Sequence, residues 1–268
     1  MSIISNQIIY PESDGQPMAD NTRQFDWIVT IKCGLEAMFK DNPMVFVAGD
    51  LLWYPVEGQP SIRYAPDAMV VFGRPKGPRG SYRQWEEGNI APQVVFEVLS
   101  PGNDRPEMER KRLAYERYGV EEYYEFDPDR IKLRGWIRQE GQLKPIANMQ
   151  GWVSPRLGVR FELVPGDTDK ELKMYGPDGR VFESYLDIAI QREEAERRIE
   201  QQYHSYLDVT TQRDEAALRA DQEFQRAELE RHKADQEFQR AELERQKVER
   251  LKALLKNLQP DLDLEDFE

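Results

Sequence analysis

Two carboxylates lie where a folded chain rarely places charge, one at the start of an apolar segment and one inside another. Asp67 directly precedes the apolar residues 68–72, and Glu97 interrupts the apolar segment QVVFEVLS at residues 93–100. A buried carboxylate costs several kcal/mol unless it is paired or binds a cation. Magnesium takes oxygen ligands, typically one or two carboxylates together with water and a substrate phosphate. The two acids therefore predict a metal site, and the alternative is an ion pair between Glu97 and an arginine such as Arg63 or Arg110.

Lys111 is the third residue whose position suggests chemistry. Residues 104–118 are predicted to form a helix, with Asp104 as its N-cap and Gly119 as its C-cap. One stripe of this helix should pack on a sheet, and it consists of Met108, Lys111, Tyr115 and Tyr118. A lysine is unusual there, so its side chain either extends to solvent or points at the carboxylates. The second arrangement suits phosphodiester hydrolysis, in which a metal activates water and a lysine orients it or stabilises developing charge.

The elements that must position these residues follow an α/β order. The spacing between Asp67 and Glu97 suits two neighbouring strands, and the apolar run around Glu97 predicts a strand buried on both faces of a sheet. The sequence predicts a helix over residues 23–41 and strands over 44–56, with an interruption at Gly49-Asp50, and over 68–72, 93–100, 121–128 and 130–138. The predicted fold class is therefore α/β, with a mixed sheet flanked by helices.

Five short motifs occur in order: YAPD at residues 64–67, VVFEVLSP at 94–101, RKRLAY at 110–115, YGVEEYY at 118–124 and DPD at 127–129. Together they resemble the bacterial Uma-type family of restriction endonucleases, which belongs to the PD-(D/E)XK nuclease superfamily. The resemblance covers roughly residues 20–185. It implies a restriction-endonuclease-like core in which Asp67 and Glu97 bind Mg²⁺ or Mn²⁺. It also implies the backbone carbonyl of Val98 as a third metal ligand.

The sequence departs from the superfamily pattern at one position. The lysine that usually follows the glutamate by two residues is replaced by Leu99. The resemblance implies that Lys111, on the following helix, takes the catalytic role of that lysine. Glu36 on the first helix and Asp50 after the first strand are further candidates for the metal shell. The alternative is that Glu36 is an ordinary residue of a helix surface and Asp50 an ordinary turn acid.

A run of basic residues lies in the loop between the two acids. Arg74, Lys76, Arg79 and Arg83 occur there, and no acidic residue stands between Asp67 and Glu86. Such a strip beside a metal could contact nucleic-acid phosphates and would make binding depend on salt. The alternative is a solvated surface loop.

Composition limits the classes of protein. The formal net charge is −13, so any contact with nucleic acid must be local rather than a result of overall charge. The only cysteine is Cys33, and the only histidines are His204 and His232, which excludes cysteine or histidine zinc sites and histidine-dependent triads in the predicted core. No apolar run is long enough to span a membrane, and the N-terminus lacks the features of a secretory signal. We therefore expect a cytoplasmic protein without membrane contact.

The composition changes after the predicted nuclease domain. We divide the chain into an N-terminal arm at residues 1–22, the nuclease-like domain at 23–182, a helical extension at 183–258 and an acidic tail at 259–268. In the extension, ADQEFQRAELERHK at 220–233 recurs as ADQEFQRAELERQK at 234–247, a period of two heptads. The predicted coiled-coil seam runs through Phe224, Ala227, Arg231, Ala234, Phe238, Ala241, Arg245 and Val248. The extension either forms a homo-oligomer through this seam or remains a solvated single helix.

Two functional hypotheses follow. The first is a metal-dependent endonuclease that hydrolyses phosphodiester bonds of DNA. The second is a catalytically inactive nuclease-fold scaffold that acts as an interaction protein through its coiled coil; the acidity, Leu99 and the repeated tail favour it. A nuclease for structured RNA or flaps is a weaker third reading, because fold does not determine substrate. The direction of the Lys111 side chain separates the first two hypotheses.

Overall fold

A mixed β-sheet forms the centre of the domain in the computed structural model, which describes residues 8–165 and 170–258. Its strand order is β1-β3-β5-β6-β7-β8. These strands are β1 (Val45–Ala48), β3 (Ala68–Phe72), β5 (Val94–Val98), β6 (Glu122–Asp127), β7 (Lys132–Gln139) and β8 (Gln142–Pro145). β5 and β6 run parallel, and the other neighbouring pairs are antiparallel. The prediction that the Glu97 strand is central and fully buried is confirmed.

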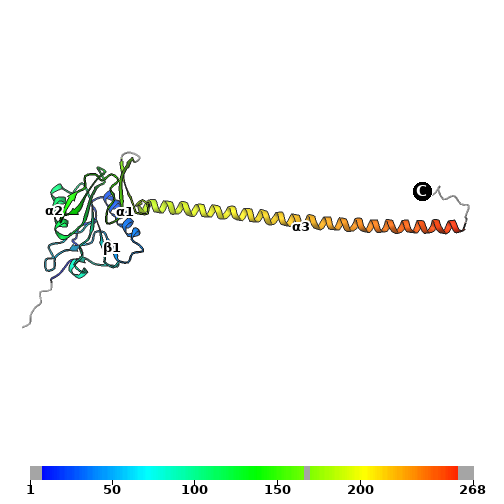
Figure 1. Cartoon of the computed structure of the whole chain (residues 1–268), viewed down its shortest axis with the longest axis horizontal. Coiled ribbons are helices and arrows are strands. Elements are labelled where there is room, and N and C mark those ends of the chain that lie inside the picture. Colours follow the sequence, from blue (N-terminus) through cyan, green and yellow to red (C-terminus); the bar gives the residue numbers. More distant parts are fainter. Residues whose placement is uncertain (1–7, 166–169, 259–268) are drawn as a thin grey trace, which may run out of the picture. The chain divides into compact units, whose positions relative to one another are not determined.

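Two helices cover the two faces of this sheet (Figure 1). α1 (Thr22–Met38) begins at Asn21, whose side chain accepts a hydrogen bond from the backbone of Gln24. α2 (Arg105–Tyr118) begins at Asp104, which caps the helix in the same way. It ends at Gly119, whose φ of 101° is readily adopted only by glycine. Both predicted caps of α2 are confirmed.

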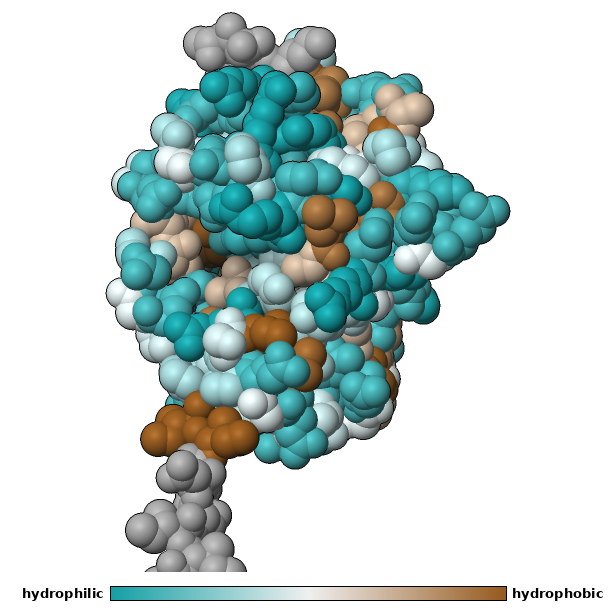
Figure 2. All heavy atoms as spheres, turned by 90° about the vertical axis from the view of Figure 1, so that its left-hand side faces the viewer, coloured by the Kyte–Doolittle hydropathy of each residue, from teal (hydrophilic) through white to brown (hydrophobic). Residues whose placement is uncertain are grey.

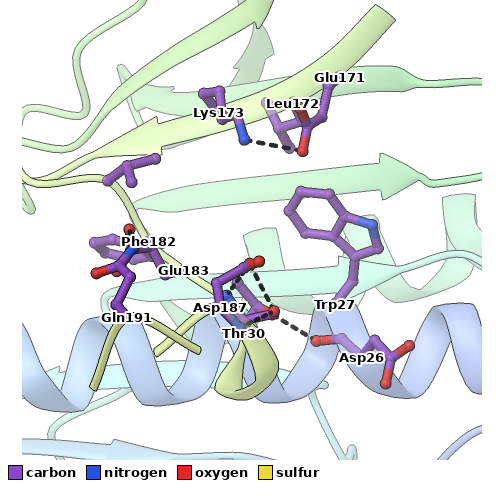
Figure 3. Close-up of a pocket in the computed structure, with 12 residues that line it drawn as sticks. Asp26, Trp27, Thr30, Glu171, Leu172, Lys173, Phe182, Glu183, Asp187 and Gln191 are labelled. Atoms are coloured by element: carbon purple, nitrogen blue, oxygen red, sulfur yellow. Dashed lines mark hydrogen bonds and ion pairs between the residues drawn. The ribbon is translucent and has the colours of Figure 1, made fainter. Parts of the chain in front are cut away.

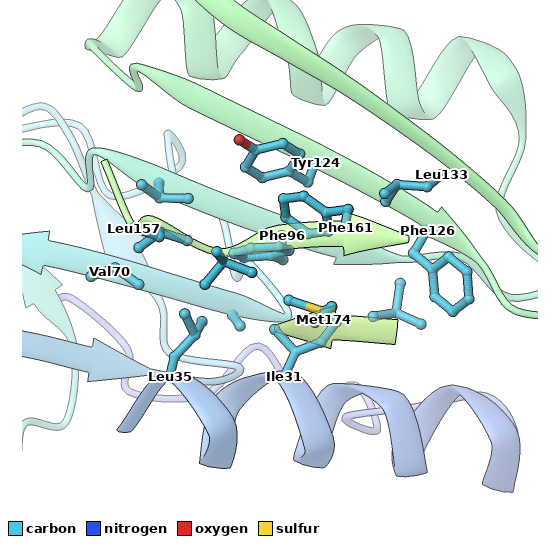
Figure 4. Close-up of a cluster of buried hydrophobic side chains, with 14 of the residues drawn as sticks. Ile31, Leu35, Val70, Phe96, Tyr124, Phe126, Leu133, Leu157, Phe161 and Met174 are labelled. Carbon is cyan, nitrogen blue, oxygen red and sulfur yellow. The ribbon is translucent and has the colours of Figure 1, made fainter. Parts of the chain in front are cut away.

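The first apolar core lies between the sheet and α1. Figure 4 shows Ile31 and Leu35 of α1 directed at Phe96 and Tyr124 of the sheet. A hairpin of β9 (Arg160–Pro165) and β10 (Lys170–Tyr175) closes this side with Phe161 and further apolar residues. The core explains the apolar residues of β5 that point toward α1, because alternate residues of a strand face the same side.

The second core lies under α2 and determines where Glu97 points. Val95 packs there with Tyr115 of α2. Glu97 follows two residues after Val95 on β5, so its side chain also faces α2. A two-stranded sheet of β2 (Trp53–Tyr54) and β4 (Tyr82–Arg83) joins this side, followed by the 3₁₀ helix η1 (Gln84–Glu87).

The strand expected over residues 44–56 divides into β1 and β2, as the predicted interruption indicated. Asp50 lies between them with a left-handed φ of 49°. Its backbone N–H donates to the carbonyl of Pro66, 3.0 Å away. This bond ties the break in the first strand to the residue that precedes Asp67.

The C-terminal helix α3 (Tyr185–Leu258) carries the 14-residue repeat, and nearly all of its described side chains are exposed. The chain divides into two units between Gln191 and Arg192. The proposed acidic tail at 259–268 and the first seven residues of the arm lie outside the described residues. Within the described ranges, no helix combines the length and apolar character needed to cross a membrane.

A tight approach between α1 and the segment before α3 gives a test of the packing. A Cβ at Gly34 would overlap the ring of Phe182. Without a clash, alanine in a helix stabilises by up to about 1 kcal/mol relative to glycine. We expect Gly34→Ala to destabilise by about 1–3 kcal/mol instead, because the ring must move. Thermal unfolding measures this, and Phe182→Leu should partly rescue the variant; a raised Tm in Gly34→Ala alone would contradict the packing.

Candidate active site

Glu97 is the centre of the site, because both oxygens of its buried carboxylate are bound by α2. Lys111 Nζ lies 2.8 Å from Glu97 Oε2. The hydroxyl of Tyr115 donates to Oε1 at 2.5 Å. Only 3% of the Glu97 side chain is exposed, against 26% for Lys111. The lysine therefore points at the carboxylate rather than outward, and the pairing partner is neither Arg63 nor Arg110.

Asp67 lies beside Glu97 on the neighbouring strand. Ala68 pairs with Phe96 in the register of β3 and β5, which places the residues next to them side by side. The backbone N–H of Val98 donates to Asp67 Oδ2 at 2.6 Å. Burial and then repulsion from Glu97 raise the pKa of Asp67 well above its usual value, against the hydrogen bond from Val98 and the charge of Lys111. Two carboxylates thus lie side by side on neighbouring strands.

Asp50 is one of the two further candidates for the metal shell, and its charge interacts with those of Glu97 and Lys111. Burial raises its pKa most, and repulsion from Asp14 and Glu97 adds to this, while Lys111 lowers it. Glu36 does not join the group. Its side chain is 54% exposed and binds Lys32 one turn earlier on α1, at 2.5 Å. The reading of Glu36 as an ordinary residue of a helix surface therefore describes its position.

The carbonyl of Val98 is engaged by α1. It accepts a hydrogen bond of 2.8 Å from the side-chain amide of Gln24, which is itself buried. A carbonyl oxygen has two lone pairs, so a metal-ligand role for Val98 stays a prediction. Gln24 was missed at the sequence level, since a glutamine in an apolar helix stripe gives no indication of its partner.

The basic residues expected to contact phosphate at 74–83 all make contacts within the protein, and their contact with nucleic acid stays a prediction. Arg74 and Arg79 both bind Glu87, at 2.8 and 2.7 Å. Arg83 binds Glu86 at 3.3 Å. Lys76 donates to backbone carbonyls just after α1, those of residues 39 and 40. The turn of η1 brings the two glutamates back onto the loop, so half of the loop's positive charge is compensated by carboxylates.

A second buried acid neighbours Glu97 and was also missed. Glu125 on β6 pairs directly with Glu97 in the sheet register and is 3% exposed. Arg134 on β7 lies opposite it, with a nitrogen 2.8 Å from Glu125 Oε2. The hydroxyl of Tyr123 donates to its other oxygen at 2.9 Å. The available signal was an acid flanked by two aromatic residues within the strand predicted at 121–128.

The donor set fits a small hard cation. Asp67 and Glu97 supply carboxylate oxygens, the ligands that Mg²⁺ and Mn²⁺ take alongside water and substrate phosphate. Burial and then repulsion from Glu97 raise the pKa of Asp67, and a bound cation would favour its ionised form. Across residues 8–165 and 170–258, no group of three or more acid, histidine or cysteine side chains is arranged to hold a metal. The arrangement thus suits a two-carboxylate site completed by water and substrate.

A hollow of about 470 Å³ lies elsewhere, between α1, β10 and the start of α3 (Figure 3). Asp26, Glu171 and Asp187 contribute carboxylates to its lining, and Glu171 pairs with Lys173 at 2.9 Å. None of the predicted site residues lines it, so it is separate from the group around Glu97.

The mixed sheet flanked by helices is the fold expected of a nuclease-like protein. The chain belongs to the Uma2 family, described as "Putative restriction endonuclease", which matches residues 16–168. No curated protein matches the chain. A crystal structure described as "a putative nuclease belonging to DUF820", from Anabaena variabilis, covers 54% of this chain and 79% of its own, with 15% sequence identity and a TM-score of 0.39.

The electrostatic conflict predicts that removing a charge stabilises the protein. The folded state binds a proton at Asp67 more tightly than the unfolded state, so the free energy of unfolding falls as pH rises from about 3.8 through the raised pKa. We expect Asp67→Asn to raise the Tm of the metal-free protein at neutral pH by about 2–4 °C, equivalent to about 1 kcal/mol. The gain should vanish near pH 3.5. Glu36→Gln, at an exposed carboxylate, is the matched control; a lower Tm for Asp67→Asn at neutral pH would contradict the electrostatic conflict.

Proposed function

We propose that this protein is a cytoplasmic, metal-dependent endonuclease that hydrolyses phosphodiester bonds of DNA. The observation that carries the proposal is the contact between Lys111 and Glu97 on the buried central strand, beside Asp67. Asp67 and Glu97 would hold Mg²⁺ or Mn²⁺, with Asp50 nearby. Membership of a family described as a restriction endonuclease supports the reaction class.

Lys111 suits the role of a fixed cation. Burial acts to lower its pKa, but the attraction and hydrogen bond of Glu97 together with the charge of Asp67 raise it overall. The ammonium therefore stays charged at neutral pH. A charged lysine cannot take a proton from water, so we assign Lys111 to orienting the water and stabilising charge on the phosphate. Bound metal would lower the pKa of that water and neutralise the phosphate.

Tyr115 is a positioning residue in this scheme. It does not reach substrate, because it is fully buried behind Glu97. Its hydroxyl holds one oxygen of the carboxylate while Lys111 holds the other. Partners that orient a metal ligand in this way commonly change metal affinity or activity 10–100-fold when removed.

The second candidate is an inactive scaffold that self-associates through α3. Two observations favour it: both oxygens of Glu97 are engaged by protein groups, and the 14-residue repeat lies on an exposed helix. Self-association is compatible with both candidates, whereas DNA cleavage is compatible only with the nuclease. The two candidates therefore differ in the cleavage assay and not in the oligomeric state.

Cleavage of supercoiled plasmid in Mg²⁺ or Mn²⁺ tests the nuclease proposal. We expect nicking that chelator abolishes and that falls about 100-fold or more in Asp67→Asn, Glu97→Gln and Lys111→Met, because each removes a ligand or the fixed cation. Glu36→Gln should retain activity. Calorimetric metal binding by the same samples shows whether lost activity follows lost metal. If the wild-type protein binds no metal and cuts no DNA, the nuclease proposal is refuted and the scaffold candidate remains.

Light scattering of the full chain tests the coiled coil. Phe224 and Phe238 hold equivalent seam positions in the two repeats, and Leu229 and Leu243 hold equivalent positions on the opposite side of the helix. We expect an oligomer that dissociates when both phenylalanines become glutamate, since charge on the seam is desolvated at an interface. The same change at both leucines should leave the mass unaltered. A monomeric wild type would assign α3 to a solvated single helix.

A further inference from the structure

We propose that a basic groove next to the acid pair binds the DNA backbone at the phosphates beside the one that is cleaved. The groove encloses about 440 Å³, and four cations line it: Arg105, Arg130, Lys132 and Arg134. This inference rests on the proposed nuclease function and gives it a path for the substrate strand.

The register of the sheet places this groove beside the site. Leu99 lines it and stands two residues after Glu97, so both lie on the α2 side of the chain. Arg134 pairs across the sheet with Glu125, and Glu125 pairs with Glu97. Neighbouring strands lie about 4.8 Å apart, which puts the backbone of Arg134 about 10 Å from that of Glu97. Phosphates advance about 3.4 Å per nucleotide along a duplex, so the groove lies within about three nucleotides of the acids.

Two of the four cations are free to bind an anion. Within the described part of the chain, the side chains of Arg105 and Lys132 are exposed and make no hydrogen bond or ion pair. The other two are paired: Arg130 with Asp127 at 3.0 Å, and Arg134 with Glu125 at 2.8 Å. Paired arginines can still donate to a phosphate through their remaining N–H groups.

The acids that line the groove are occupied by the fold. Asp104 accepts the backbone N–H of Glu107 as the N-cap of α2, at 2.7 Å. Asp127 accepts two backbone N–H groups of the following turn as well as the Arg130 side chain. Their charges are therefore partly compensated, and the first turn of α2 adds partial positive charge on the same side. The groove has a local excess of positive charge in a chain whose net charge is −13.

An extended polyanion fits this site better than an apolar partner. The side of the domain that carries α2 is predominantly hydrophilic, with apolar side chains only in small separate groups (Figure 2). The cations come from separate parts of the chain, namely the start of α2, the β6–β7 turn and β7, and so are not concentrated on one element. Such a set of cations near a phosphodiester-cleaving site matches consecutive phosphates of one strand.

Fluorescence anisotropy with a labelled DNA duplex of about 20 base pairs tests the groove; chelator is present so that no cleavage occurs. The test variant is Arg105→Gln with Lys132→Gln, which removes the two unpaired cations. The matched control is Lys40→Gln with Arg180→Gln, which removes two exposed cations near the far end of α1. We expect binding about tenfold weaker in the test variant. The slope of log K against log salt should become shallower by about 1.8, because two phosphate contacts are lost.

The outcomes separate this proposal from the nuclease proposal. Wild-type affinity and salt slope in the test variant, an equal loss in the control, or no DNA binding by wild-type protein would each overturn the groove. Groove-dependent binding without cleavage under any metal would support the groove and refute the nuclease. Cleavage that requires Asp67, together with DNA binding that is unchanged when Arg105 and Lys132 are replaced, would support the nuclease and refute the groove. Circular dichroism of both double variants confirms that they fold.

Discussion

The burial of Glu97 on the central strand is the constraint on which the rest of the site depends. A carboxylate at this position is costly unless its oxygens are bound. The fold meets that need with one helix, since Lys111 and Tyr115 lie one turn apart on α2 and bind one oxygen each. The caps at Asp104 and Gly119 then fix where that helix begins and ends. The packing of α2 on the sheet is thus tied to a charged group as much as to apolar contact.

The same arrangement places three carboxylates, those of Glu97, Asp67 and Asp50, near the single ammonium of Lys111. Lys111 neutralises one carboxylate, yet burial and then repulsion from Glu97 raise the pKa of Asp67, and burial, Asp14 and Glu97 raise the pKa of Asp50. A fold selected for stability alone would not hold such a group together, because replacing one acid with a neutral residue removes the repulsion. Stored repulsion of this kind is a common feature of sites that bind cations or ionised substrates. The crowding of buried acids is therefore consistent with the cation proposed for this site.

The fold could be predicted from the sequence because its main helices and strands each have a recognisable local sequence pattern. The apolar run around Glu97, the cap at Asp104 and the break at Gly49-Asp50 all appear where expected. The stripe on α2 placed Lys111 on the face that packs against the sheet but left its direction open, and the contact with Glu97 supplies that direction. The site partners that were missed depend on contacts between distant segments: Gln24 reaches Val98 from α1, and Glu125 meets Glu97 only through the register of β5 and β6. Neither spacing nor composition contains that register.

The distribution of positive charge shows why basic residues that are close in sequence differ from those that the fold leaves without a partner. Arg74 and Arg79 are close in sequence and look like a strip, but the turn of η1 returns Glu87 to both. Arg105 and Lys132 are far apart in sequence and look unremarkable, yet the sheet brings their elements to one groove and supplies neither with a carboxylate partner among the described residues. An ion pair already formed must be broken before an arginine gives its full charge to phosphate, whereas an exposed cation without a partner loses only water and counterions. Unpaired cations from separate elements are therefore the better guide to where an acidic protein meets DNA.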